Sequence, residues 1–229
     1  MLDFHNHVLP GIDDGSPDNE TTLLLINGLN TLGFDNVKGS PHIIADTHPN
    51  NQESISSAFN SAVSFLKDNH QNSLIGYSAE HMIDDVFMAK LKNKESLLCV
   101  KDKTILVELS YAQKPDHLES VSFQLQIDGY IPILAHPERY PYYHKDYKNN
   151  YTYLKDLGFD FQLNLLSLTP YYGKEVQQIA QKLLSEGYYD YACTDLHHTR
   201  HLEALNTFFT KDSLTELFKN HKLRNEELV

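Results

Sequence analysis

Short apolar runs rich in β-branched residues alternate with longer amphipathic stretches along almost the whole chain. A short apolar run is typical of a buried strand, whereas apolar residues spaced by three and four positions are typical of one face of a helix. One stretch with the helical spacing contains Ile55, Phe59, Ala62, Val63 and Leu66. The pattern therefore predicts strand and helix units that repeat along the chain.

This rhythm predicts seven strands and seven helices, followed by a last helix and a polar tail within residues 211–229. The strands are expected to end near His5, Ser40, Glu80, Glu108, His136, Asn164 and Asp195. The helices are expected at Asp18–Leu32, Gln52–Asn69, Asp84–Lys92, Pro115–Asp128, Tyr147–Leu157, Tyr171–Glu186 and His201–Phe209. A glycine, the residue that most often ends a helix in the left-handed conformation, follows four of the amphipathic stretches, at Gly33, Gly129, Gly158 and Gly187.

Alternating strands and helices favour an α/β fold with a parallel sheet covered by helices. About seven units in 229 residues favour a closed or nearly closed barrel, with an open doubly wound sheet as the alternative. Neither a G-x-G-x-x-G stretch after a strand nor a G-x-x-x-x-G-K-[ST] stretch occurs. The glycine-rich phosphate loops of nucleotide-binding folds are therefore not indicated.

Composition and charge narrow the class of protein. A length of 229 residues with 41% hydrophobic residues suits a single domain over residues 1–229. The net charge of −12 argues against nucleic acid as the main partner. Cys99 and Cys193 have no paired spacing, and neither a leader-like segment nor a membrane-spanning apolar run is visible. These features predict a cytoplasmic protein that does not span a membrane.

Histidines and carboxylates recur where the predicted strands end. His5 and His7 are two residues apart, so their side chains point to the same side of a strand. The carboxyl ends of parallel barrel strands form one face, so residues at successive strand ends converge there. Such a mixture of imidazoles and carboxylates favours a first-row metal site. Its other members are His42, Glu80, Glu108, His136, Asp195 and His197.

Any single residue of this kind is more often solvated or hydrogen-bonded than bound to a metal, and only the joint pattern carries the prediction. The remaining histidines fall in predicted helices or polar loops and are expected to be solvated or structural. They are His48, His70, His81, His117, His144, His198, His201 and His221.

Six stretches resemble, in order and spacing, the polymerase and histidinol phosphatase (PHP) superfamily, and in particular the bacterial PHP-type protein-tyrosine phosphatases of capsule and exopolysaccharide gene clusters. They are "DFHNHVLPGIDDGS", "SPH", "AEHM", "ILVELS", "LAHPERY" and "TDLHH". The resemblance covers residue 3 to about residue 200. It implies a distorted seven-stranded (β/α)7 TIM-like barrel, the PHP fold, with up to three divalent ions at its carboxyl-terminal face.

The resemblance also implies a ligand set for each ion. The first ion would take His5, His7, Glu80 and Asp195; Glu80 would bridge to a second ion with Glu108 and His136; a third would take Asp14, His42 and His197. Mn²⁺ is expected, with Fe or Zn as alternatives for such an N/O shell. Asn6 is expected to point away from the ions, and Asp13 to serve mainly the turn.

The implied chemistry is hydrolysis of a phosphomonoester by a hydroxide that bridges two metal ions. Arg139 would donate hydrogen bonds to the phosphoryl oxygens. Asp14 and His42 would act with it by holding the third ion, which would bind the phosphate. The alternative for Arg139 is a salt bridge to Glu138, and Arg200 is a weaker candidate for the same role.

A thiolate mechanism with a C-x₅-R loop is not indicated. Six residues rather than five separate Cys193 from Arg200, and Asp195 between them opposes thiolate formation. Cys193 is instead expected to be a small core residue.

The implied substrate is the tyrosine-rich tail of a bacterial tyrosine kinase in capsule or exopolysaccharide regulation. Two tyrosine clusters, "RYPYYH" and "TPYYG", either line the rim of the site or pack at the edge of the barrel. The alternatives are a small-molecule phosphatase, such as one acting on histidinol phosphate, and a non-catalytic, metal-binding regulatory PHP domain.

Overall fold

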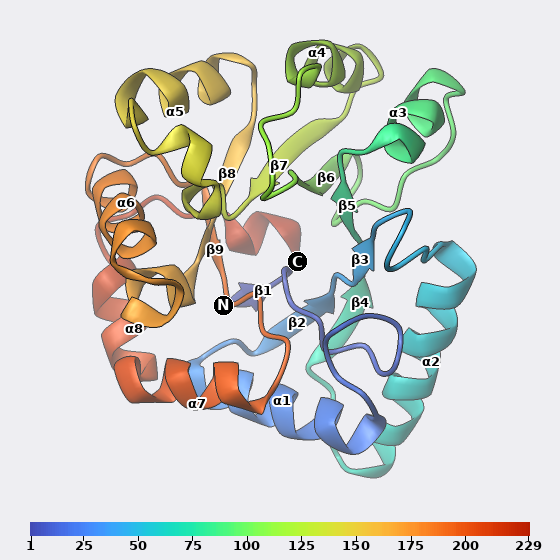
Figure 1. Cartoon of the computed structure of the whole chain (residues 1–229). Coiled ribbons are helices and arrows are strands. Elements are labelled where there is room, and N and C mark those ends of the chain that lie inside the picture. The colour runs from blue at the N-terminus through green and yellow to red at the C-terminus, as the bar shows by residue number, and fades with distance from the viewer.

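Strands lie at the centre of the molecule and helices surround them (Figure 1). The computed structural model describes residues 1–229, and every pair of neighbouring strands is parallel. The expected α/β class with a parallel sheet is therefore confirmed. None of the helices is both long and apolar enough to span a membrane.

The strands form two parallel sheets, and the prediction of seven strands is wrong. The first sheet has the order β1-β2-β4 and the second β3-β5-β6-β7-β8-β9. The strands are β1 (Leu2–Asp3), β2 (Asn36–Gly39), β3 (His42–Ile43), β4 (Leu74–Tyr77), β5 (Glu80–Met82), β6 (Thr104–Glu108), β7 (Ile131–Ala135), β8 (Asp160–Asn164) and β9 (Tyr191–Cys193).

Two of the predicted strands are each divided into a pair of short strands, which accounts for the two additional strands. The strand predicted to end near Ser40 stops at Gly39 and resumes at His42 as β3. The intervening Pro41 has no N–H for a ladder hydrogen bond. The next strand is interrupted at Ser78, whose backbone N–H donates to the carbonyl of Gly39.

A closed TIM barrel is not confirmed, because β1 and β9 lie side by side without a continuous ladder. The side chain of Asp3 accepts a hydrogen bond from the backbone N–H of Thr194, which replaces a strand-to-strand bond. Asp195 then has a φ of +51°, which ends β9. The two chain segments are joined again around the bridge between Asn6 and Leu196, where Asp195 N donates to the carbonyl of His5 and His7 N donates to the carbonyl of Leu196.

The helices form close to the expected positions, and the residues at their ends explain why. They are α1 (Asn19–Leu32), α2 (Gln52–Asp68), α3 (Asp85–Lys92), α4 (Leu118–Ile127), α5 (Tyr147–Asp156), α6 (Lys174–Ser185), α7 (Thr199–Phe208) and α8 (Lys211–Phe218). The Asp18 side chain accepts from Thr21 N and so caps α1, which Gly33 ends with a φ of +98°. Side-chain caps of this kind satisfy N–H groups that have no partner within the helix.

Two helices start three residues later than predicted, α4 at Leu118 rather than Pro115 and α6 at Lys174 rather than Tyr171. Pro170–Tyr172 forms a separate 3₁₀ turn instead of the first turn of α6, and Gly173 follows with a φ of +93°. The chain therefore changes direction before the helix begins, which leaves the two tyrosines of this turn near the carboxyl ends of the strands.

A small apolar cluster fills the space between the strands below their carboxyl ends. Leu106 lies two residues before Glu108 on β6 and therefore faces the same side of the sheet. The centre of the strand assembly is packed rather than open, and polar side chains gather only at one end. The cluster consists of Leu2, Phe4, Val100, Leu106, Ile133, Ala135, Tyr191, Cys193 and Leu228.

The C-terminal segment closes the opposite end of the strands, close to the N-terminus (Figure 1). Asn225 is 2% exposed, and its amide Nδ2 donates to the carbonyls of Leu2, at 2.9 Å, and Ala192, at 2.8 Å. Its Oδ1 accepts from the backbone N–H of Ala192 at 3.2 Å. This one side chain joins β1 to β9 where the ladder between them is missing.

We expect Asn225→Ala to lower the free energy of unfolding by about 2–4 kcal/mol, because three buried backbone groups lose their partner. Asn60→Ala is the matched control, since Asn60 is exposed on α2 and the same substitution there should change stability by less than about 0.5 kcal/mol. Urea unfolding followed by circular dichroism measures both variants. Equal stability of the two variants would contradict the role given to Asn225.

Candidate metal centre

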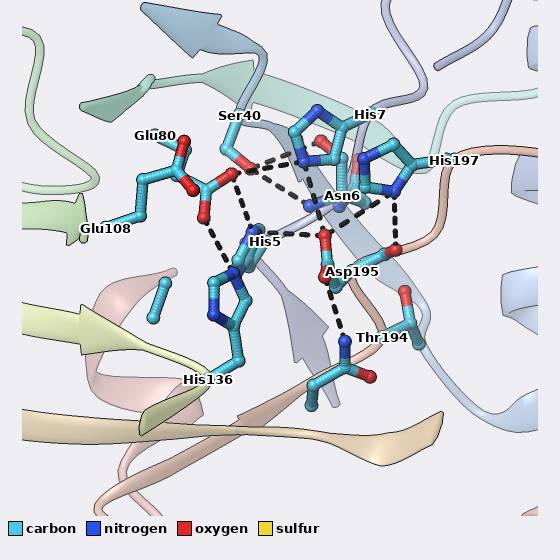
Figure 2. Close-up of polar contacts among 12 residues, drawn as sticks. His5, Asn6, His7, Ser40, Glu80, Glu108, His136, Thr194, Asp195 and His197 are labelled. Atoms are coloured by element: carbon cyan, nitrogen blue, oxygen red, sulfur yellow. Dashed lines mark hydrogen bonds and ion pairs between the residues drawn. The ribbon is translucent and has the colours of Figure 1, made fainter. Parts of the chain in front are cut away.

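The histidines and carboxylates expected at successive strand ends gather at one place, at the carboxyl ends of the strands (Figure 2). His42 and Glu80 come just after the carboxyl ends of β2 and β4, where they begin the short strands β3 and β5. Glu108 ends β6, and His136 directly follows β7. The parallel arrangement is what brings residues so distant in sequence together.

Glu80 lies at the centre of the cluster and is fully buried. Its Oε2 is 3.2 Å from His5 Nε2, 3.4 Å from His7 Nε2 and 3.1 Å from His42 Nδ1. Its Oε1 is 3.0 Å from His136 Nε2. Both oxygens of one carboxylate therefore face imidazoles, as a bridging ligand would require.

Asp195 forms the other side of the cluster. Its Oδ1 lies 3.3 Å from both His5 Nε2 and His7 Nε2. Its Oδ2 accepts hydrogen bonds of 2.8 Å from Arg139 Nη1 and from Asn164 Nδ2. One oxygen is thus held by the protein, while the other points toward the histidines.

Asp14 approaches from the loop after β1 and is 58% exposed. Its Oδ1 is 3.6 Å from His42 Nε2 and 3.6 Å from His197 Nε2. The His197 ring stacks on His7 with 3.8 Å between centroids. This third part of the cluster is the most accessible to solvent.

Six buried polar atoms of the cluster have no hydrogen-bond partner, although polar atoms of neighbouring side chains lie close by. They are His5 Nε2, His7 Nε2, His42 Nδ1, Glu80 Oε2, Glu108 Oε1 and Asp195 Oδ1. Buried polar atoms normally have a hydrogen-bond partner, so a group of neighbouring ones without partners indicates a binding site for another atom or ion. Lone pairs of imidazole and carboxylate around one point suit a divalent first-row cation, so the residues fit the expected metals.

Three groups of these atoms are compact enough to hold one ion each, with all atoms of a group within 4.8 Å of one another. The groups are His5, His7, Glu80 and Asp195; His7, Asp14, His42 and His197; and His42, Glu80 and Glu108. The first matches the expected set, and the second adds His7 to the expected one. In the third, His42 takes the place expected for His136, which contacts Glu80 instead. The assignment of ligands to ions stays a prediction.

Burial and charge act in opposite directions on the site histidines. Burial would lower the pKa of His5, but the charges of Glu80 and Asp195 raise it to about 10. His42 is also buried, yet Glu80 and Glu108 raise its pKa to about 12. Burial and the charge of Glu80 raise the pKa of Glu108 to about 7. Without a cation, protons therefore neutralise the carboxylates.

The histidines are oriented through their second ring nitrogen. His5 Nδ1 is 2.7 Å from Gln162 Oε1, and His197 Nδ1 is 2.8 Å from the backbone carbonyl of Asp195. His7 Nδ1 is 2.7 Å from Asp13 Oδ2. Such contacts leave the other nitrogen of each ring available to a metal.

The expectation that Asp13 serves mainly the turn is wrong. Besides His7, its carboxylate accepts hydrogen bonds from the backbone N–H groups of Gly15 and His42. Burial opposes ionisation of Asp13, but His7 and the donors around it lower its pKa to about 2. The turn buries this side chain against the cluster, which the sequence spacing did not reveal.

Arg139 pairs with Asp195, and the alternative of a salt bridge to Glu138 is wrong. Its guanidinium lies between two aromatic rings, 4.2 Å from the centroid of Tyr172 and 5.0 Å from that of Tyr111. Glu138 points elsewhere and accepts from the backbone N–H of Asn164 and from the Tyr189 hydroxyl. Arg200 is exposed on α7 and forms no ion pair.

The cluster opens into a cavity with an aromatic wall. The residues that line it are Asp14, His42, Glu108, Tyr111, His136, Arg139, Tyr172, Asp195, His197, His198 and His201. Of the two tyrosine clusters, "TPYYG" contributes Tyr172, whereas Tyr140 and Tyr143 of "RYPYYH" are fully buried. The cluster "TPYYG" therefore reaches the rim of the site, whereas Tyr140 and Tyr143 of "RYPYYH" belong to the core.

Sequence reasoning missed several residues at the site. Tyr111, His198 and His201 line the cavity, although the two histidines were expected to be only solvated or structural. Gln162 and Asn164 alternate with Phe161 and Leu163 on β8. A buried polar pair in an otherwise apolar strand was the available signal.

Other expectations about nearby residues agree with the structure. Asn6 points to backbone, because its Nδ2 donates to the carbonyls of Asp3 and Lys38. Cys193 is fully buried on β9, and burial together with the charge of Asp3 raises the pKa of its thiol. A reactive thiolate is therefore not present at this position.

Comparisons with known proteins agree with this geometry. The putative tyrosine-protein phosphatase CapC of Staphylococcus aureus is 25% identical over 231 aligned residues, which cover 98% of this chain and 84% of that protein. The tyrosine-protein phosphatase YwqE of Bacillus subtilis is 25% identical over 224 residues, which cover 96% and 84% of the two chains.

The fold is similar to a crystal structure from work on YwqE of Bacillus subtilis and CpsB of Streptococcus pneumoniae, described as unique metal-dependent tyrosine phosphatases. The TM-score is 0.82 at 22% identity, over 99% of this chain and 90% of that one. The sequence model of the family described as "Capsular polysaccharide synthesis, CpsB/CapC" matches residues 1–205. The chain therefore belongs to the CpsB/CapC family of capsular polysaccharide synthesis proteins.

Proposed function

We propose that the chain is a metal-dependent protein-tyrosine phosphatase. The observation that carries this proposal is that six unpartnered buried histidine and carboxylate atoms belong to compact candidate ion-binding groups that share Glu80, next to a cavity with an aromatic wall. The names of the relatives CapC and YwqE support the same activity. Residues 1–229 would act as one catalytic domain.

The ligands we propose are those implied by the resemblance. One ion would be held by His5, His7, Glu80 and Asp195. A second would be held by Glu80, Glu108 and His136, and a third by Asp14, His42 and His197. When bound, such cations activate water near neutral pH and neutralise charge on phosphoryl oxygens. Mn²⁺ is the metal we favour, and Fe or Zn would suit the same donors.

Arg139 would bind the phosphate and keep it oriented toward the ions. One of its nitrogens donates to Asp195, and a guanidinium has five N–H donors, so donors remain for phosphoryl oxygens. The stacking of Tyr111 and Tyr172 on either side limits its motion. A donor group held in this way loses little freedom when the substrate binds.

The aromatic wall would hold the phenyl ring of phosphotyrosine. Tyr111 is 42% exposed, and Tyr172 lies beside the ring of His201. Apolar ring faces next to a phosphate-binding arginine suit an aryl phosphate better than an aliphatic one. The substrate we propose is the tyrosine-rich tail of a bacterial tyrosine kinase that regulates capsule or exopolysaccharide synthesis. The two unpaired cysteines suit a cytoplasmic location.

The decisive experiment compares substrates with and without metal. We expect the protein with Mn²⁺ to release inorganic phosphate from a phosphotyrosine peptide, to lose this activity after chelation and to regain it when Mn²⁺ is restored. Histidinol phosphate, which lacks an aryl phosphate, should be hydrolysed with a kcat/KM lower by about 100-fold. Glu80→Gln, which keeps the shape of the side chain, is the matched inactive control.

Two outcomes would contradict the proposal. A preference for histidinol phosphate would identify a small-molecule phosphatase. Failure to hydrolyse either substrate, or p-nitrophenyl phosphate, at any metal concentration would identify a metal-binding domain without catalysis.

We expect Cys193→Ser to retain hydrolysis within about twofold, because the thiol is buried in β9 and does not face the cavity. Initial rates with p-nitrophenyl phosphate and Mn²⁺ measure this. A complete loss of activity in a variant with unchanged circular dichroism would favour a thiolate mechanism.

We also expect metal binding to release protons at about pH 7.5, and the apparent affinity for Mn²⁺ to rise as the pH rises. The pKa values of His5 and His42 lie above this pH, near 10 and 12, so both rings are protonated before metal binds and must lose a proton to offer a lone pair. Isothermal titration calorimetry in two buffers of different ionisation enthalpy counts these protons.

His117→Ala is the control, because it removes an exposed histidine away from the site and should release the same number of protons. Binding of Mn²⁺ that is independent of pH would contradict the expectation.

A further inference from the structure

Asp13 and Asp14 are adjacent in sequence but have opposite environments. The side chain of Asp14 is 58% exposed and faces His42 and His197. The side chain of Asp13 is 0% exposed and faces His7. The loop after β1 therefore turns one carboxylate toward the cavity and the other behind the cluster.

Every contact of the Asp13 carboxylate is with an N–H donor. Oδ2 is 2.7 Å from His7 Nδ1 and 3.1 Å from the backbone N of His42, and Oδ1 is 3.0 Å from the backbone N of Gly15. A single buried side chain thus connects the segment after β1, the loop and the start of β3. It lies behind the imidazole and contributes no atom to any of the three candidate ion-binding groups.

The loop has hydrogen bonds of its own besides that of Asp13. Ser16 N donates to the carbonyl of His7, and Gly11 N donates to the carbonyl of Ser16. A side chain on Gly15 would bring its Cβ to 2.1 Å from the carbonyl oxygen of His7. The loop is thus folded tightly against His7, and the carboxylate of Asp13 is aimed at that imidazole.

Asp13 differs from the groups that orient the other site histidines. His5 faces the neutral amide of Gln162, and His197 faces a backbone carbonyl. Carboxylates of candidate ligands also lie near the Nδ1 atoms of His42 and His197. Only His7 has at its Nδ1 a carboxylate that belongs to none of the candidate ion-binding groups. It is also the only histidine present in both four-membered groups, so the orientation of its ring affects two candidate ion positions.

We infer that Asp13 is a positioning residue for the metal centre: its carboxylate keeps the proton of His7 on Nδ1 and so presents Nε2, without a proton, to the cations on the other side of the ring. The same carboxylate fixes the backbone of His42 and couples the two ion positions that share His7. Asp13 does not touch the substrate or a cation. The effect of Asp13 on catalysis rests on the proposed function, whereas its effect on metal binding does not.

Asp13→Asn is the informative substitution because it preserves the shape of the side chain. All three contacts need an acceptor, and the amide has to turn its NH₂ group toward at least one N–H donor. We expect the apparent affinity for Mn²⁺ to fall by about 10–100-fold, the usual effect of losing a group that orients a metal ligand. Hydrolysis of a phosphotyrosine peptide at limiting Mn²⁺ should fall with it and recover when Mn²⁺ is in excess.

Asp18→Asn is the matched control, since Asp18 is an exposed aspartate that follows the same loop and caps α1, and it should bind Mn²⁺ like the native protein. Free Mn²⁺ measured by electron paramagnetic resonance gives the affinities without any enzymatic assay. Unfolding temperatures show whether each variant is folded.

Native affinity for Mn²⁺ in a folded Asp13→Asn protein would overturn the inference, as would loss of stability without loss of affinity. Failure of the proposed function has a different signature. If the native protein bound Mn²⁺ but did not hydrolyse phosphotyrosine, the function would be wrong, while the effect of Asp13→Asn on affinity would still test the role of Asp13.

Discussion

The structure depends on a group of buried carboxylates whose negative charge is only partly balanced by an arginine. Glu80, Glu108 and Asp195 are at most 2% exposed, and the penalty for moving a carboxylate out of water is several kcal/mol even in a real protein. Only Asp195 has an arginine partner, so histidines have to balance most of the charge. Protons or divalent cations would have to balance the remaining negative charge, which is the physical basis for proposing a metal site here.

Much of the fold serves to hold that arrangement. Parallel strands bring their carboxyl ends together, an apolar cluster fills the space below the site, and Asn225 ties β1 to β9 at the far end. The left-handed backbone of His136 and Asp195, with φ values of +34° and +51°, occurs where the chain leaves β7 and β9 at the site. Such conformations persist in non-glycine residues only when the surrounding structure holds them. Here they direct the side chains of His136 and Asp195 toward the cluster.

The sequence predicted the elements well because their signals are local. The helical periodicity, the Asp18 cap and the glycine after α1 each depend on a few neighbouring residues. The count of strands failed because the chain changes sheets at Pro41 and Ser78: β2 pairs with β4 in the first sheet, whereas β3 pairs with β5 in the second. The open ladder between β1 and β9 likewise comes from Asp3 and Thr194, which lie at opposite ends of the chain.

By itself, the sequence determined the α/β alternation and the set of histidines and carboxylates at strand ends, since both follow from residue spacing. Only the tertiary structure decided which nitrogen of each ring faces the centre, that Asp13 rather than a solvent molecule lies behind His7, and that Arg139 is stacked between Tyr111 and Tyr172. The physical reason is the same in each case. Spacing along one strand fixes the side to which a residue points, whereas the partner it meets comes from another strand or loop, and its position depends on packing that no local pattern records.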